Sequence, residues 1–255
     1  MTTRNETDSI RHLQLLNGWW DFQPMAHADL AVPLTPERVP ETGWQTACYL
    51  VPGFFTDHPY LEAWRKARSG WMRVRFEVER RLIDSRRAYL TIKGAIPKAF
   101  VFLNGSQVAA QEDMFIGDEH EVTRFLRPGA NELTVFLTEF KTFPHPTGGK
   151  LSLIDVPWGC CIAAAQAGIW QDVELEWRAP IHVADVTIRT STRTSELTVI
   201  TRVHNADSKP HDFVLNHAVK DGDAEVLTFP PSRISLKPGE SREITMLFSD
   251  LQGFT

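Results

Sequence analysis

The chain has 255 residues, with 27 Lys and Arg against 32 Asp and Glu, and three cysteines. This length allows one or two domains, each with an apolar core of its own. The mildly acidic balance and the lack of any dense basic run argue against nucleic acid or an anionic membrane as the main partner, because both bind clustered Lys and Arg.

Targeting and metal-binding signals are not visible. No apolar stretch approaches the ~20 residues that span a bilayer, and residues 1–20 are polar, so we expect a cytoplasmic protein. Cys48 and the adjacent pair Cys160–Cys161 form no spaced disulfide framework, so we expect reduced thiols. The sequence contains no C-x-x-C, H-x-H or H-E-x-x-H, so we expect neither a metal nor another cofactor.

A period of two dominates the chain. In residues 72–79 every second residue is apolar and the others are Arg or Glu, which is typical of a half-buried antiparallel strand. Similar runs lie at 89–92, 99–103, 132–138, 173–177, 183–189, 197–203, 213–219, 225–229, 233–236 and 242–248. Only residues 60–67 and 119–125 suggest short helices. Many short strands predict an all-β chain built of β-sandwiches.

The composition changes near Pro180. All eight Trp and all three Tyr lie at or before Trp177, and Val, Ile, Leu and Thr dominate the later strands. We predict two domains, residues 10–179 and residues 180–255. The second shows five or six strands where an immunoglobulin-like sandwich has about seven. We therefore expect a truncated sandwich with an open, aggregation-prone sheet edge.

Six motifs in order resemble glycoside hydrolase family two, the β-galactosidase, β-glucuronidase and β-mannosidase group. They are Leu16-Asn17-Gly18-Trp19-Trp20-Asp21-Phe22, Val51-Pro52-Gly53, Gly70-Trp71-Met72-Arg73-Val74-Arg75-Phe76, Val101-Phe102-Leu103-Asn104-Gly105, Leu126-Arg127-Pro128-Gly129-Ala130-Asn131-Glu132-Leu133 and Gly168-Ile169-Trp170-Gln171-Asp172-Val173. The spacing agrees over residues 15–180, with Met72 in place of the more usual Tyr. The resemblance implies a galactose-binding-like jelly roll over 10–179 and an incomplete immunoglobulin-like sandwich over 180–255.

These motifs predict structure better than chemistry. Asn104–Gly105 supplies the positive φ values of a tight hairpin, and Asn131 should satisfy backbone groups of the turn at Pro128–Gly129. Trp170 and Trp177 are expected in the core rather than on a ligand platform.

No catalytic residue is predicted. Retaining glycosidases need two carboxylates about 5 Å apart. The resemblance places both on a (β/α)8 barrel of roughly 250 residues after the second sandwich. Residues 1–255 hold neither that barrel nor its Asn-Glu acid/base motif, since Asn131–Glu132 lies inside a turn. We therefore predict that the chain alone hydrolyses no glycoside.

Sugar contacts are predicted only in two long loops, residues 54–64 and 141–167. The resemblance implies that jelly-roll loops help to shape the rim of the sugar pocket at the mouth of the barrel. Aromatic faces stack on sugars and Asp accepts hydrogen bonds from hydroxyls, so the candidates are Asp57, Trp64, Asp155 and Trp158. For each of them, packing under a loop or at a domain interface is the slightly favoured alternative. Lys150 is doubtful, because Gly149-Lys150-Leu151 departs from a Gly-Lys-Gln-x-Trp pattern seen in several members of the family.

Three functions remain open. The favoured one is the non-catalytic front part of a β-glycosidase, with a β-glycoside and a catalytic barrel as partners. The second is a stand-alone carbohydrate-binding module, and the third is an interaction protein that uses an open sheet edge. The kind of sugar and the presence of a homo-oligomer are left undecided.

Overall fold

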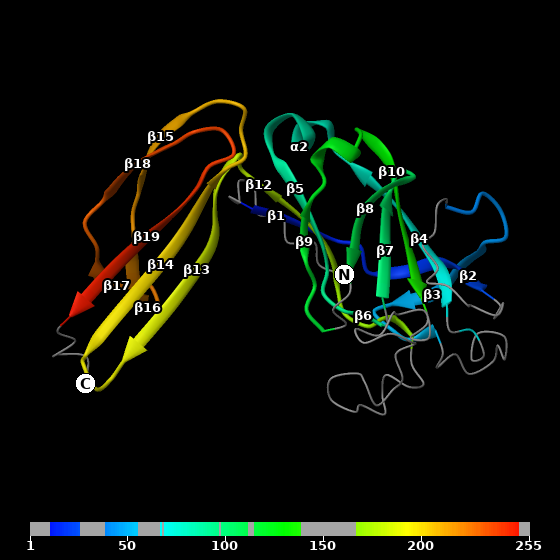
Figure 1. Cartoon of the computed structure of the whole chain (residues 1–255), viewed down its shortest axis with the longest axis horizontal. Helices are drawn as coiled ribbons and strands as arrows, with labels where there is room; N and C mark the ends of the chain where they lie inside the picture. The colour runs from blue at the N-terminus through cyan, green and yellow to red at the C-terminus, as the bar shows by residue number, and fades with distance from the viewer. Residues whose placement is uncertain are drawn as a thin grey trace, which may run out of the picture. The chain divides into compact units, whose positions relative to one another are not determined.

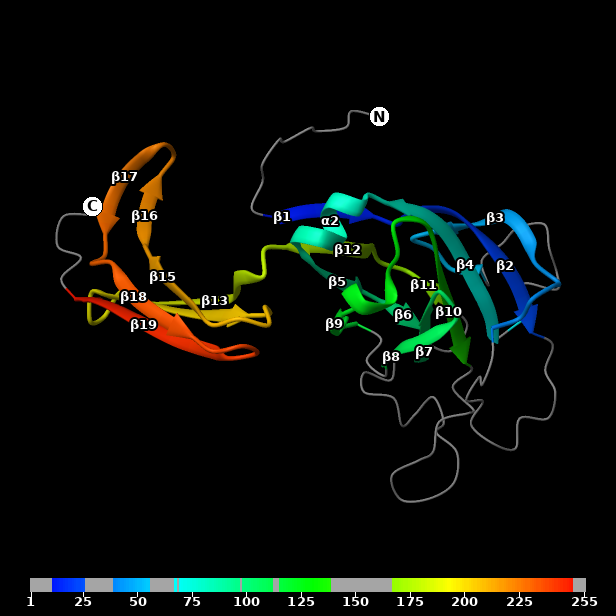
Figure 2. The ribbon, with the colours of Figure 1, turned by 90° about the horizontal axis from the view of Figure 1, so that it is seen from above.

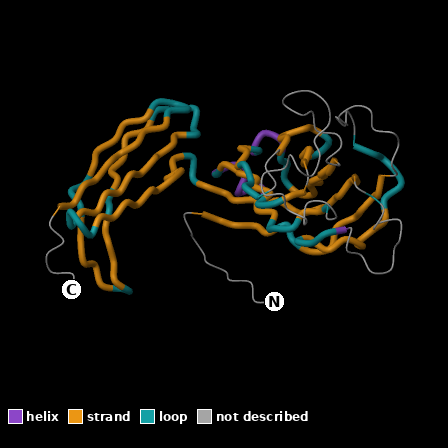
Figure 3. Tube along the Cα trace, turned by 60° about the horizontal axis from the view of Figure 1, so that its bottom comes forward, coloured by secondary structure: helices purple, strands orange, loops and turns teal. Residues whose placement is uncertain are grey.

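The computed structural model describes residues 11–25, 39–55, 67, 69–96, 98–111, 115–138 and 167–249. Most of these residues lie in strands, drawn in orange in Figure 3, and the sheets are sandwich-like, which confirms the all-β prediction. The chain divides into two compact units, the first ending at Trp177 and the second beginning at Arg178. None of the described helices is long and apolar enough to cross a membrane.

One layer of the first unit is a six-stranded antiparallel sheet (Figure 1). Its strands, in spatial order, are β3 (Gln45–Val51), β2 (Gly18–Met25), β4 (Ser69–Val78), β10 (Gly129–Thr138), β7 (Lys98–Leu103) and β8 (Ser106–Gln111). The second layer contains β1 (Arg11–Leu15), β12 (Val173–Arg178), β5 (Arg87–Ile92) and β9 (Glu119–Glu121). A short pair, β6 (Ala95–Ile96) with β11 (Gly168–Ile169), accompanies them.

The main core of this unit joins side chains from both layers. Trp20 and Phe22 of β2 belong to one buried cluster with Leu175 and Trp177 of β12. In β12, Val173, Leu175 and Trp177 are buried in alternation with the less buried Glu174 and Glu176. This is the two-residue period that predicted the strand, and Trp177 lies in the core as expected.

Strand β4 is more buried than its sequence period predicts. Its residues from Ser69 to Arg73 are all buried, whereas further along the strand Arg75 and Glu77 are exposed. The first half of β4 therefore packs on both faces of its sheet, and only the second half is a half-buried strand.

The helix expected over residues 119–125 is absent. Residues 119–121 form β9, which pairs with β5, and Thr123–Phe125 is a single 3-10 turn. The segment is fixed to β5 by the Val122 amide, which donates to the Ala88 carbonyl at 2.8 Å, and by the Ala88 amide, which donates to Thr123 Oγ1 at 2.8 Å. Pairing with a distant strand thus overrides a weak local helical pattern.

The described residues contain one α-helix, which the periodicity did not predict. Helix α2 (Arg80–Ser85) has six residues, and Leu82 is its buried residue. A helix this short provides too few turns for a periodic signal. The other expected helix, residues 60–67, lies outside the described residues except for its last position.

The second unit has one three-stranded sheet and two strand pairs (Figure 1). The sheet contains β13 (Ile181–Ser191), β14 (Glu196–Asn205) and β19 (Ser241–Ser249). The pairs are β15 (His211–Leu215) with β18 (Ser232–Leu236), and β16 (Ala218–Asp221) with β17 (Ala224–Thr228). The strand expected over 213–219 is interrupted at Asn216 and His217.

Candidate functional site

All four predicted sugar-contact residues, Asp57, Trp64, Asp155 and Trp158, lie outside the described residues, as does Lys150. The site can be built only from the residues that flank the two predicted loops. These flanking residues belong to the first unit and have well-defined partners.

The strand ends next to these segments lie along one edge of the six-stranded sheet. Met25 at the end of β2 pairs with Ser69 at the start of β4, and Gly70 pairs with Leu137 near the end of β10. Thr138 in turn pairs with Lys98 at the start of β7. We call this row, completed by Gln111 opposite Ala99, the strand-end edge. Four segments connect to strands that begin or end at the strand-end edge, or to Phe55 and Ala167. They are residues 26–38, 56–66, 112–114 and 139–166.

The chain before the first loop and the chain after the second are hydrogen-bonded to each other. The Phe55 amide donates to the Ala167 carbonyl at 3.0 Å, and the Gly53 amide donates to the Ile169 carbonyl at 2.7 Å. The first loop therefore begins beside the residue at which the second loop ends, although Phe55 and Ala167 are far apart in the sequence.

Tyr49 joins the two segments through its hydroxyl group. This group accepts a hydrogen bond from the Ile169 amide at 2.8 Å and donates to the Gly53 carbonyl. Its ring lies 6.2 Å from the Phe55 ring and 5.8 Å from the Phe22 ring, between centroids. Burial raises the pKa of Tyr49, because the phenolate would lose its hydration.

Gly168 allows this close approach. A Cβ atom at this position would lie 2.3 Å from the Gly53 carbonyl oxygen and 2.8 Å from the Tyr49 hydroxyl oxygen. A side chain therefore cannot fit unless the backbone moves. The close contact with Gly53 and Tyr49 explains why the motif Gly168-Ile169-Trp170-Gln171-Asp172-Val173 begins with a glycine.

The same motif holds the first strands of the unit. Asn17 Nδ2 donates to Asp172 Oδ1 at 2.8 Å, and the Val173 amide donates to Asn17 Oδ1 at 3.0 Å. The Leu16 amide donates to the Val173 carbonyl at 2.9 Å. Two motifs from opposite ends of the domain thus form one structural unit.

Two asparagines stabilise turns of the six-stranded sheet, as the sequence predicts. Asn104 lies in the turn between β7 and β8, and Asn131 bonds the turn that precedes β10. Asn104 and Gly105 have φ values of 50° and 84°. Asn131 accepts from the Arg127 amide at 3.0 Å and donates to the Arg127 and Gly129 carbonyls at 2.7 and 2.8 Å. Asn104 Nδ2 also donates to Asn131 Oδ1 at 2.8 Å. These are turn contacts, not a ligand site.

The outer face of the six-stranded sheet carries a cluster that sequence reasoning missed. Near the strand-end edge, four aromatic side chains form a second buried cluster, Trp71, Phe100, Phe102 and Phe136. Trp71 and Phe136 are register partners with ring centroids 4.8 Å apart. The signal was present as Phe100 and Phe102 at alternate positions of β7, with Trp71 of β4 and Phe136 of β10 on the same face, opposite the main core.

Next to these rings, Arg73 lies in a charged network although only 8% of it is exposed. Its Nη2 is 2.7 Å from Asp21 Oδ2 and its Nε is 3.7 Å from Glu132 Oε2. The Trp44 ring covers its guanidinium at 4.1 Å. Asp21 and Glu132 each face a guanidinium, so the arrangement is an ion-pair network rather than a pair of free acids. Among the described residues, no group of three or more His, Cys, Asp or Glu side chains could hold a metal.

The fold and the strand-end edge define a β-sandwich domain in which several strands begin or end in one row. Residues 50–143 match the family model described as "Glycosyl hydrolase 2 galactose-binding domain-like". This match confirms the resemblance to glycosyl hydrolase family 2 that the motifs predict.

Individual relatives agree with this assignment. An exo-β-D-glucosaminidase from Streptomyces avermitilis is 27% identical over 247 residues, covering 88% of this chain and 26% of the relative. A β-galactosidase from Priestia megaterium is 23% identical, covering 95% of this chain and 25% of the relative. The fold resembles a calcium-binding mutant of Bacteroides uniformis β-glucuronidase 2 with a TM-score of 0.72 and 19% identity, over 93% of this chain and 28% of that one. The chain thus spans about a quarter of the curated relatives it matches.

Proposed function

We propose that this chain is the non-catalytic front part of a β-glycosidase. In this proposal, residues 10–179 form a jelly-roll domain that supports a catalytic (β/α)8 barrel and shapes part of the rim of its sugar pocket. Residues 180–255 belong to an immunoglobulin-like sandwich, and the substrate is a β-glycoside. The supporting observation is the strand-end edge, where both predicted loops connect to a rigid, hydrogen-bonded base.

The proposal rests on two further arguments. Tyr49 and Ile169 are buried and hydrogen-bonded to each other, and the Gly53 amide bonds the Ile169 carbonyl, as expected of a support that holds variable loops in place. The matched relatives are glycosidases by name, and this chain covers only 26% and 25% of two of them, which leaves room elsewhere in such proteins for a barrel of roughly 250 residues.

The first test is catalytic. The purified 255-residue chain is incubated with nitrophenyl β-galactoside, β-mannoside and β-glucuronide, and release of nitrophenol is followed. We expect no turnover above the buffer rate, because neither barrel carboxylate is supplied. Turnover that survives repeated purification would overturn the proposal.

The second test concerns the rim. Calorimetric titration with galactose, mannose and glucuronate should give weak binding, in the millimolar range, because a rim provides few of the contacts of a closed pocket. Trp64→Ala and Trp158→Ala should abolish any such signal. Trp19→Ala is the matched control, because Trp19 is exposed and pairs with Leu50, far along β2 from the strand-end edge. Micromolar binding of a polysaccharide would favour the stand-alone carbohydrate-binding module instead.

A further inference from the structure

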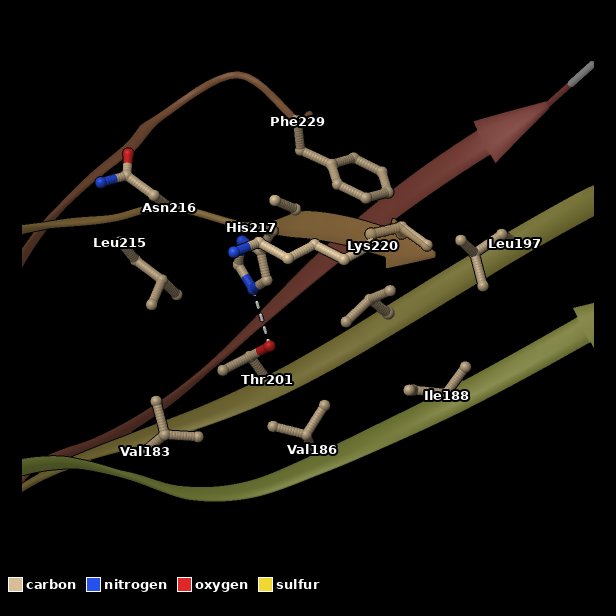
Figure 4. Close-up of a pocket in the computed structure, with 13 residues that line it drawn as sticks. Val183, Val186, Ile188, Leu197, Thr201, Leu215, Asn216, His217, Lys220 and Phe229 are labelled. Atoms are coloured by element: carbon tan, nitrogen blue, oxygen red, sulfur yellow. Dashed lines mark hydrogen bonds between the residues drawn. The ribbon is translucent and has the colours of Figure 1, made fainter. Parts of the chain in front are cut away.

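The three-stranded sheet of the second unit has an inner face and an outer face. An apolar groove of about 500 Å³ lies on the inner face. Figure 4 shows Val183, Thr201 and His217 lining this groove, with a dashed line for the hydrogen bond between Thr201 and His217. In Figure 2, β16 and β17 lie on one side of the layer formed by β13 and β19. Because side chains alternate along a strand, the sequence neighbours of Val183 and Thr201 face outward, away from the groove.

Two histidines lie next to each other on the outer face. His182 of β13 precedes Val183, and His204 of β14 follows Val203, which is buried in the core. The register of the two antiparallel strands places His182 directly opposite His204, and the centroids of their rings are 5.7 Å apart. A search for H-x-H does not find this pair, because the two residues belong to different strands and only the strand register brings them together.

Both rings are oriented by a hydrogen bond through Nδ1. His182 Nδ1 lies 2.9 Å from the Ala179 carbonyl oxygen. A carbonyl only accepts, so this nitrogen carries the hydrogen, and Nε2 of the neutral ring carries the lone pair. His204 Nδ1 lies 2.8 Å from Ser241 Oγ of β19, which can accept in the same way. Histidines that bind metals have this arrangement, because the bond from one ring nitrogen to an oxygen holds the ring while the other nitrogen binds the ion.

Burial and charge around the pair favour a cation. His182 is only 6% exposed, so its ring has little freedom left to lose when it binds an ion. In the next row of the outer face, register places Arg202 between Asp185 of β13 and Glu243 of β19. This row therefore carries two negative side chains and one positive side chain. A net negative charge beside two neutral imidazoles attracts a divalent cation.

We propose that His182 and His204 bind one Zn²⁺ ion through their Nε2 atoms, with water completing its coordination. Two nitrogen ligands at about 2.0–2.1 Å from a tetrahedral zinc ion lie roughly 3.3 Å from each other. Ring nitrogens lie at the edge of the imidazole, so rings with centroids 5.7 Å apart can bring two of them to this separation while the backbone stays in place. The ion takes the lone pair of each Nε2 in place of any hydrogen-bond donor.

The ion ties the start of one strand to the end of the next. His182 is the second residue of β13, and His204 is the last but one of β14. The core cluster of the second unit has only three buried apolar residues, so a metal cross-link adds stability that this core does not supply. The site is therefore a structural zinc site of the second unit. The inference does not depend on the proposed sugar-rim function.

The test is a calorimetric titration of the full 255-residue chain with Zn²⁺. The cysteines are alkylated first, because thiolates also bind zinc. We expect a dissociation constant on the order of 10 µM. His182→Gln and His204→Gln should each weaken binding at least tenfold, because a single imidazole cannot chelate the ion. His12→Gln is the matched control, since His12 lies in β1 of the first unit, and the affinity of this variant should equal that of the wild type.

Nuclear magnetic resonance of the ring nitrogens identifies the ligands directly. The Nε2 resonances of His182 and His204 should shift together as Zn²⁺ is added. Zinc should also raise the thermal unfolding midpoint of the wild type, followed by circular dichroism, more than that of either glutamine variant. His204 is only partly buried, so His204→Gln is expected to fold even if His182→Gln, at a buried position, does not.

Three results would overturn the inference. One is the absence of zinc binding at concentrations up to about 1 mM. Another is binding of wild-type affinity in His204→Gln, since the ion would then be held by other residues of the chain. The third is a zinc-dependent shift of only one of the two rings, because a site that uses one histidine is not the site proposed.

Discussion

Single side chains hold the base of the predicted loops. Tyr49 and Asn17 each bond a backbone group of a segment that is remote in the sequence. Asn131 bonds backbone groups of the turn next to it. Because a buried polar group without a partner costs roughly 1–3 kcal/mol, these positions should be sensitive to small chemical changes.

Tyr49→Phe removes one hydroxyl and keeps the ring. The Ile169 amide loses its acceptor and the Gly53 carbonyl loses a donor, so we expect the first unit to be destabilised by about 1–3 kcal/mol. Urea unfolding followed by tryptophan fluorescence measures this loss. An unchanged midpoint would mean that the hydroxyl does not hold the two segments together.

The same hydroxyl predicts an alkaline pH dependence. The folded state holds the pKa of Tyr49 above the ordinary value of 10.0 because of burial. The unfolded chain therefore releases this proton at lower pH than the folded chain. The stabilisation is complete below pH 10 and declines as the pH rises above it towards the folded-state pKa. The stability difference between wild type and Tyr49→Phe should shrink above pH 10 and stay constant between pH 7 and 9.

Gly168→Ala tests the close approach of two backbone segments. The added Cβ would lie 2.3 Å from the Gly53 carbonyl oxygen, so one segment must move. Overpacking of this kind costs about 1–3 kcal/mol, and the midpoint of thermal unfolding should fall accordingly. A variant as stable as the wild type would contradict the spacing of Gly53 and Gly168.

At the scale of elements, β2 and β4 are joined by charge as well as by their ladder. Asp21 of β2 bonds Arg73 of β4 through Arg73 Nε and Nη2, at 3.0 and 2.7 Å, beneath the Trp44 ring. Removing one partner of a buried ion pair lowers stability strongly, because the remaining charge stays buried without its counter-charge. The outer face of the six-stranded sheet therefore depends on this pair.

Asp21→Ala should destabilise the first unit by about 2 kcal/mol, since hydrogen bonds to charged groups contribute about 1.5–3 kcal/mol each and Glu132 still offers partial compensation. Glu174→Ala, which removes a more exposed partner from Lys93, is the comparison and should cost less than about 1 kcal/mol. Chemical denaturation of both variants measures the difference. Equal losses would show that burial of Arg73 does not matter.

At the scale of the whole molecule, the two units differ in how well their cores are filled. The first has an extensive buried core, and the second has three buried apolar residues in its cluster beside the open groove. Because buried apolar area is the main stabilising contribution, we expect the second unit to unfold first.

Tryptophan fluorescence and circular dichroism can separate the two events. All eight tryptophans lie at or before Trp177, so fluorescence reports on the first unit alone, whereas far-UV circular dichroism reports on the strands of both. We expect the dichroism signal to begin its loss at lower urea concentration than the fluorescence signal. Coincident transitions would indicate that the units unfold as one.

Most of the strands and the family were predictable from the sequence, for reasons visible in particular residues. The alternation in residues 173–177 reflects a strand with one buried face. Asn104–Gly105 specifies the turn between β7 and β8 locally, through two positive φ values. The four residues proposed to contact sugar all lie outside the described residues. The helix expected at 119–125 was wrong, because that segment pairs with β5, more than 25 residues earlier in the chain.

The sequence by itself determined the all-β class, the order of motifs and the relation to glycosyl hydrolase family 2, because these depend on local periods and turn residues. Only the tertiary structure decided that Tyr49 and Gly168 join two segments far apart in the chain, that the outer face of the first half of β4 is buried, and that an apolar groove lies between β13, β14 and β16. Each of these depends on contacts between residues far apart in the chain, and a local pattern of apolar and polar residues does not encode which distant segment a strand will face.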